Sequence, residues 1–153
     1  MKSEISSDPT KYDSVIIKTI SRIMVPFVQL FALYVIMHGT SGPGGGFQGG
    51  VILGASIILF IIGFGLPIAK ERYKEKFITI LSSTGLFIYS GIGLIAVFLG
   101  GKYLQYNVYP QVTHEPINAL MIDLVEIGIG ITVMAIMISI FFDLSEKTSR
   151  EET

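Results

Sequence analysis

Four long apolar blocks limit what this chain can fold into more than any other feature of its sequence. Each supplies the roughly 20 apolar residues that a helix needs to cross a bilayer. Half of the 153 residues are hydrophobic, only 15% are charged, and the charged residues gather between the blocks. The sequence therefore predicts an all-α membrane protein with four transmembrane helices, at about residues 14–38, 51–69, 77–100 and 119–142.

The positive residues predict how the helices cross the membrane. If the chain crosses four times, ten of its 11 Lys and Arg residues lie on one side and only Lys102 lies on the other. Cytoplasmic loops carry the excess of positive residues, so both termini are expected in the cytoplasm. We thus divide the chain into a polar segment (1–13), a transmembrane domain (14–142) and a polar tail (143–153).

The composition argues against several classes of function. The absence of cysteine excludes thiolate metal sites and iron–sulfur ligation by this chain, and the presence of only two histidines argues against a histidine-rich metal site. The net charge of −1, without a basic stripe, argues against a nucleic-acid partner. No nucleophile is paired with a base in a recognisable motif, so we expect no catalytic residues, no metal site and no bound cofactor.

A glycine-rich stretch, HGTSGPGGGFQGG, separates the first two apolar blocks at residues 38–50. It contains a G-x-G-x-x-G pattern, but a dinucleotide site needs a strand before the pattern and an acidic residue about 20 positions after it. Here a predicted transmembrane helix precedes the pattern, and no lysine occurs between Lys18 and Lys70 to complete a phosphate loop. The stretch is therefore interpreted as an outer turn that leads into the second helix.

The same glycines suggest close packing between helices. Gly46, Gly50 and Gly54 are spaced four residues apart, and such a ridge of small residues lets another helix approach closely in lipid. We interpret the ridge as a seam that faces protein and invites a partner. The predicted packing motif comprises Pro43, Gly44, Gly45, Gly46, Phe47, Gln48, Gly49, Gly50 and Gly54.

Two acidic residues lie inside the fourth apolar block. Asp123 and Glu126 are three residues apart, so they share one face of a helix. One interpretation is that they are acids at the outer end of the helix, satisfied by water, a helix N-terminus or a basic residue of a partner. The other is that they take up a proton or a hard cation such as sodium, because adjacent carboxylates share a proton or hold a cation between them.

Two further residues are candidates for special roles in the first helix. His38 stands where this helix meets the glycine turn, where it would cap the last carbonyl groups or relay protons. We include it with Asp123 and Glu126 as an ion-path candidate. Pro26 lies inside the same helix, where it removes one backbone hydrogen bond and predicts a kink.

The block PGGGFQGG (43–50), which follows His38-Gly39 and opens a second transmembrane helix, resembles the B subunit of Mrp-type multisubunit Na⁺/H⁺ antiporters, the MnhB family. The resemblance extends over about residues 14–142. It implies an accessory subunit in the cell membrane of a bacterium or archaeon, which helps to form the path for Na⁺ and H⁺ and the interfaces between subunits. The implied partners are the lipid bilayer, the large complex I-like antiporter subunits and the other small membrane subunits.

The resemblance leaves an alternative open. Related modules occur in archaeal membrane-bound hydrogenases and sulfane-sulfur reductases, in which redox chemistry drives ion transport, so the partners could be hydrogenase-like or sulfur-reductase-like subunits. A third hypothesis is a purely structural membrane subunit. The family motif includes neither Asp123 nor Glu126, so their role in handling ions is inferred from their position in the apolar block alone.

Overall fold

The computed structural model describes residues 9–39, 42–109 and 117–151. These residues form helices and no strand, so the predicted all-α class is confirmed. Four of the helices are long and apolar enough to cross a membrane, as predicted. In chain order the elements are α1 (Pro9–Met37), α2 (Gly46–Phe64), α3 (Leu66–Arg72), α4 (Glu75–Phe98), the 3₁₀ turn η1 (Tyr106–Val108) and α5 (Ile117–Glu151).

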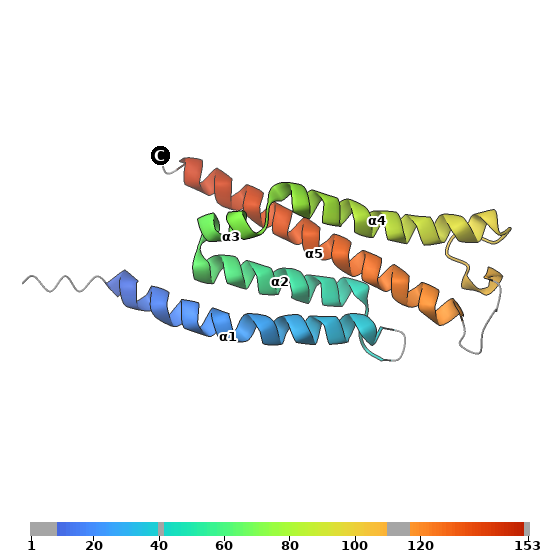
Figure 1. Cartoon of the computed structure of the whole chain (residues 1–153), viewed down its shortest axis with the longest axis horizontal. Coiled ribbons are helices and arrows are strands. Elements are labelled where there is room, and N and C mark those ends of the chain that lie inside the picture. Colours follow the sequence, from blue (N-terminus) through green and yellow to red (C-terminus); the bar gives the residue numbers. More distant parts are fainter. Residues whose placement is uncertain (1–8, 40–41, 110–116, 152–153) are drawn as a thin grey trace, which may run out of the picture.

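Along the chain, each of the four long helices runs opposite to the one before it (Figure 1). In space they lie side by side in the order α1, α2, α5, α4, so the neighbours α2 and α5 are parallel. The main packing contacts are between α1 and α2, between α2 and α5, and between α4 and α5. Two helices therefore lie inside this row, while α1 and α4 lie at its edges and expose large apolar side chains such as Leu30 and Phe87. The start of α1 and the end of α5 lie at the same end of the molecule (Figure 1). Which side of the membrane this end faces stays a prediction.

The second helix ends five residues earlier than the 51–69 block predicts. Gly65 adopts a φ of 92°, which favours glycine, and its N–H closes α2 on the Ile61 carbonyl. Pro67 then lies in the first turn of α3, where a missing N–H costs nothing. The chain thereby turns between α2 and α3, although the apolar run continues.

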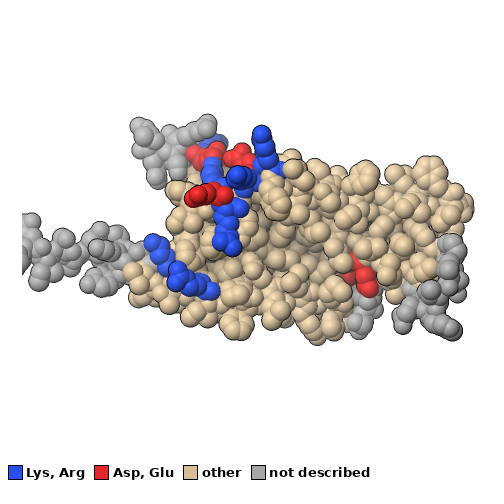
Figure 2. All heavy atoms as spheres, viewed as in Figure 1, with Lys and Arg blue, Asp and Glu red and all other residues tan. Residues whose placement is uncertain are grey.

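Charged side chains gather at the end of the molecule that contains α3, as Figure 2 shows for one face. Lys70 of α3 pairs with Glu146 of α5 and lies 3.8 Å from Glu75 of α4. These ion pairs connect three helices where the apolar blocks stop. The helix α5 continues past residue 142 into the polar tail, and α1 begins at Pro9, within the polar segment. Pro26 lies inside α1, which continues beyond it to Met37, and the kink itself stays a prediction.

The glycines of α2 lie where α2 and α5 pack most closely. A Cβ atom added to Gly50 would lie only 2.6 Å from the carbonyl oxygen of Gly130, and one added to Gly54 would lie 3.2 Å from Met137. On a neighbouring face of α2, a Cβ at Gly49 would lie 2.8 Å from the Ala32 carbonyl oxygen of α1. The ridge read from the sequence thus accommodates α5 of the same chain. Beyond it, Ile57, Ile61, Ala135, Ile138 and Phe142 form a buried apolar cluster.

The segment after α4 folds back over the end of the α4–α5 pair that lies opposite the charged cluster. Tyr109 is buried against Ile92, Ala96 and Val125, and its hydroxyl donates a hydrogen bond to the Ile92 carbonyl at 2.6 Å. The Tyr103 ring packs against Gly93, where a Cβ atom would overlap it. Tyrosines thus close this end of the helix pair. The sequence offers no periodic signal for such a cover, because it is an irregular segment.

A substitution at Gly50 tests whether the α2–α5 seam requires glycine. We expect Gly50→Ala to lower the free energy of unfolding by about 1–3 kcal/mol, because backbone atoms of Gly130 occupy the space and cannot rotate away. Gly91→Ala in α4 is the matched control, since its Cβ would meet nothing within 4 Å and alanine favours a helix. Thermal unfolding in detergent measures both, and equal stability of the two variants would contradict the packing argument.

The tyrosine cover is tested by removing one hydroxyl. Tyr109→Phe keeps the ring and removes the hydrogen bond to Ile92, which is expected to cost about 1 kcal/mol. Hydrogen exchange should then rise in residues 101–109 and at the adjoining end of α4, while residues 57–64 of α2 stay as protected as in the unchanged protein. Unaltered exchange in the cover would show that the hydroxyl does not hold it.

Candidate functional site

The turn between α1 and α2 folds back on the end of α1 through backbone hydrogen bonds. The Gly42 N–H donates to the His38 carbonyl at 3.0 Å, and the Gly45 N–H donates to the Val35 carbonyl at 3.1 Å. Gly45 has a φ of 141°, a conformation that L side chains rarely adopt. A Cβ at Gly44 would lie 2.6 Å from the Val35 carbonyl oxygen. Glycine is thus required twice where the chain reverses and starts α2.

Glu126 of α5 lies against this turn. A Cβ atom at Gly39 would overlap the Glu126 carboxylate, and one at Gly46 would overlap the Glu126 backbone carbonyl. The carboxylate therefore lies beside the residues that follow α1, in a space that exists because Gly39 and Gly46 have no side chains. We call the space formed by these two glycines the glycine cradle.

The carboxylate has an unsatisfied oxygen in this position. Glu126 Oε2 is buried and has no hydrogen-bond partner among the described residues. Asp123 Oδ1, one turn away on α5, is buried in the same way, and so is Asn118 Oδ1 near the start of the helix. A buried acceptor without a donor costs about 1–3 kcal/mol, and more when it is charged. The two carboxylate oxygens would therefore gain from a proton or a cation, and the Asn118 amide oxygen would gain from a hydrogen-bond donor or a cation.

The helix ends around Glu126 act on its charge in opposite directions. Its carboxylate lies beside Gly39, just past the end of α1, where the helix dipole gives a partial negative charge. Its backbone lies beside Gly46, the first residue of α2, where N–H groups give a partial positive charge. Because the carboxylate itself lies nearer to the carbonyl end, a bound cation or proton is favoured there over a second negative charge.

The structure does not bring His38 to the two carboxylates. Its ring is exposed and stacks on Tyr34 of α1, with 4.0 Å between ring centroids. Within the described part of the chain, no hydrogen bond or ion pair joins it to Asp123 or Glu126. The residues of the predicted packing motif are partly buried and partly exposed. Gly46, Gly49, Gly50 and Gly54 are buried, whereas Pro43, Phe47 and Gln48 are exposed.

Tyr106 belongs to the surroundings of Glu126 and is missed by the sequence reasoning. It lies in η1 and packs against the apolar cluster that includes Val125 of α5. Burial, the neighbouring Tyr109 and Tyr89, and then the charge of Glu126 raise the pKa of the Tyr106 phenol. The phenol therefore stays protonated and can act only as a neutral hydrogen-bonding group. Asn118 and Gly39 are missed as well, because their roles come from their neighbours and not from a motif.

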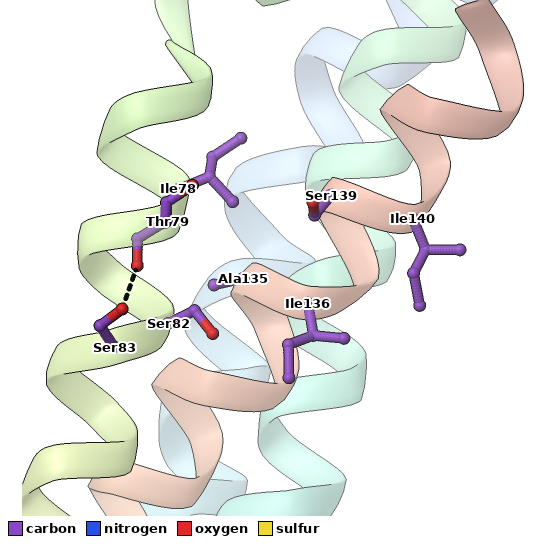
Figure 3. Close-up of a pocket in the computed structure, with 8 residues that line it drawn as sticks. All are labelled: Ile78, Thr79, Ser82, Ser83, Ala135, Ile136, Ser139 and Ile140. Atoms are coloured by element: carbon purple, nitrogen blue, oxygen red, sulfur yellow. Dashed lines mark hydrogen bonds between the residues drawn. The ribbon is translucent and has the colours of Figure 1, made fainter. Parts of the chain in front are cut away.

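A hydroxyl-lined groove of about 220 Å³ lies elsewhere, between α4 and α5 (Figure 3). Thr79, Ser82 and Ser83 of α4 and Ser139 of α5 line it, and the Ser83 hydroxyl donates to the Thr79 carbonyl at 2.9 Å. None of its eight lining residues is acidic, basic or histidine. Nor do the described residues contain a group of three or more His, Cys, Asp or Glu that could hold a metal ion. Glu126 and Asp123 are therefore the stronger candidates for handling an ion.

The glycine cradle predicts different costs at its two glycines. Gly46→Ala should lower the free energy of unfolding by about 1–3 kcal/mol, because its Cβ meets backbone atoms. Gly39→Ala should cost less, since the atoms that it meets are the far end of the Glu126 side chain, which can rotate. Gly42→Ala is the control, because only the His38 carbonyl oxygen lies near, at 3.9 Å. Thermal unfolding that ranked Gly39→Ala as more costly than Gly46→Ala would contradict the geometry.

Comparison with known proteins identifies the family of this chain. Residues 16–139 match the family described as "Domain related to MnhB subunit of Na+/H+ antiporter". Relatives named "Putative antiporter subunit mnhB2" in Staphylococcus haemolyticus and Staphylococcus aureus (strain MRSA252) are each 30% identical and cover 88% of this chain and 96% of their own length. An uncharacterized protein of Methanocaldococcus jannaschii is 31% identical over 150 residues, which cover 90% of this chain and 56% of that longer protein.

The match includes nearly all of the first three membrane-spanning helices and the fourth up to residue 139, together with the glycine turn and both acids of α5. The resemblance found in the PGGGFQGG block is thereby confirmed over most of the chain. This four-helix membrane protein belongs to the MnhB family.

Proposed function

We propose that this chain is a membrane subunit of a multisubunit Na⁺/H⁺ antiporter of the Mrp type, in which it forms part of the path for Na⁺ and H⁺. Family membership supports the antiporter assignment. The observation that carries the role in the path is the buried Glu126 oxygen without a hydrogen-bond donor, held in the glycine cradle. Glu126 is the residue that takes up the ion, and Asp123 adds negative charge one turn away.

The chemistry of the site fits exchange between a proton and a sodium ion. An ionised acid in the outer half of a membrane helix is costly, so the carboxylate is stabilised by protonation or by a cation. Carboxylate and carbonyl oxygens are suitable ligands for a hard cation, but two carboxylates do not complete a coordination shell. Water and neighbouring subunits supply the rest. An incomplete shell suits an ion in transit better than a resident metal, because conduction requires binding weak enough for release.

In the proposed complex, the chain is surrounded by lipid and by other membrane subunits. The exposed apolar faces of α1 and α4 lie against lipid and against other membrane subunits of the same complex. The complex lies in the plasma membrane with both termini of this chain in the cytoplasm, as the positive residues indicate. The chain itself carries no redox cofactor, and Na⁺ and H⁺ are its transported ions.

Antiport by the complete complex tests the role of Glu126. With Glu126→Gln in the assembled complex, Na⁺-dependent proton movement in everted vesicles is expected to fall below about a tenth of the unchanged rate, because the amide cannot exchange a proton. Asp123→Asn is expected to lower the rate by a smaller factor. Glu71→Gln makes the same chemical change at an exposed site in α3 and should leave antiport unchanged.

Blue-native electrophoresis in the same experiment separates transport from assembly. If the complex assembles normally with Glu126→Gln and antiport is unchanged, Glu126 is not on the ion path and the chain has a structural role. Metal analysis of the purified complex distinguishes a stand-alone antiporter from a redox-driven one. Iron–sulfur or nickel-bearing subunits that copurify would replace the antiporter proposal by a redox-driven pump.

A further inference from the structure

A second candidate site lies at the charged end of the molecule, far along the helices from Glu126. A cleft of about 430 Å³ opens there between α1, α2 and α3. Its lining includes two arginines, Arg22 of α1 and Arg72 of α3, which are 50 residues apart in the sequence. The rings of Phe60 and Phe64, one turn apart on α2, also line it. The fold thus brings two cations to one cleft that has an aromatic wall.

The aromatic wall holds both guanidinium groups. The Cζ atom of Arg22 lies 5.8 Å from the centroid of the Phe64 ring, and that of Arg72 lies 6.0 Å from the centroid of Phe60. The two rings stack on each other with 4.6 Å between their centroids. A cation over a ring face is attracted by the ring quadrupole, so each arginine is oriented without using its N–H groups. Those donors remain available to a ligand.

Two acidic residues at this end, Glu75 and Glu146, lie near a lysine and not near the arginines. Lys70, on the same short helix as Arg72, pairs with Glu146 and lies 3.8 Å from Glu75. Within the described ranges, neither Arg22 nor Arg72 has a carboxylate at ion-pair distance. Among the described residues, the cleft therefore carries two arginines without a paired carboxylate, whereas the neighbouring Lys70 is paired.

We propose that this cleft binds the phosphate group of an anionic phospholipid. A guanidinium group matches phosphate oxygens with two parallel hydrogen bonds, and basic pockets between transmembrane helices bind such headgroups. The cleft volume falls in the range of roughly 300–1,000 Å³ that holds an organic ligand, so it has room for more than a lone phosphate ion. Val25 and Ile68 add apolar lining next to the arginines, as an amphipathic lipid requires.

Native mass spectrometry of the purified antiporter complex tests this site. After addition of phosphatidylglycerol, the unchanged complex should retain one more lipid molecule for each copy of this subunit than the Arg22→Gln/Arg72→Gln variant. The affinity of the cleft for phosphatidylglycerol should fall by about tenfold or more in that variant, because each arginine near an anionic lipid contributes appreciably to the binding free energy. Lys76→Gln, which removes an exposed charge outside the cleft, should retain the lipid as the unchanged complex does.

Three comparisons, with phosphatidylcholine, with inorganic phosphate and with the arginine variants, test whether the cleft selects an anionic phospholipid. Phosphatidylcholine, whose headgroup is neutral overall, should not replace phosphatidylglycerol, and inorganic phosphate at millimolar concentration should not displace it. Displacement by inorganic phosphate, equal retention of phosphatidylcholine, or equal retention by the double glutamine variant would each overturn the proposal. If the glutamine variant fails to assemble, Arg22→Lys/Arg72→Lys keeps both charges. Loss of one lipid from that variant supports the site, and full retention contradicts paired hydrogen bonding.

Discussion

The rest of the structure depends on the close approach of two backbones, those of α2 and α5. Lipid tails are as apolar as the helix surfaces, so van der Waals contact between the helices drives their association in a membrane. Glycine at positions 46, 50 and 130 lets backbone meet backbone, and a methyl group at Gly50 would already be too close to Gly130. Because α1 packs on α2 and α4 packs on α5, the contact between α2 and α5 is what joins the two helix pairs into one row.

The same contact creates the candidate ion site. With α5 drawn against the glycine turn, Glu126 lies beside Gly39, and its carboxylate occupies space that any larger residue there would fill. The packing glycines and the acid proposed to take up the ion are therefore parts of one arrangement. A side chain added in the cradle acts on Glu126 as well as on stability, so replacing the acid itself separates the two effects more cleanly than replacing a glycine.

The two ends of the molecule use charge differently. At the end that holds α3, Lys70 connects α3, α4 and α5 through Glu75 and Glu146, where water is near and charges are inexpensive. In the first half of α5, the oxygens of Asp123 and Glu126 are buried without a donor from the described residues. Such groups are expected in a subunit whose neighbours, transported ions and water complete its polar contacts. The exposed apolar faces of α1 and α4 are consistent with that role.

The sequence by itself determined the number of spanning helices, the all-α class, the glycine turn and the family, because long apolar blocks and a dense glycine motif are local patterns. It placed the end of the second helix too late, since the apolar run hides the break at Gly65. It identified Asp123 and Glu126 as unusual, but could not tell what surrounds them. Only the tertiary structure decided that α5 fills the glycine ridge, that Glu126 faces Gly39, and that the His38 ring instead stacks on Tyr34. These facts depend on contacts between residues that are far apart in the chain, and no local pattern encodes which helix packs against which.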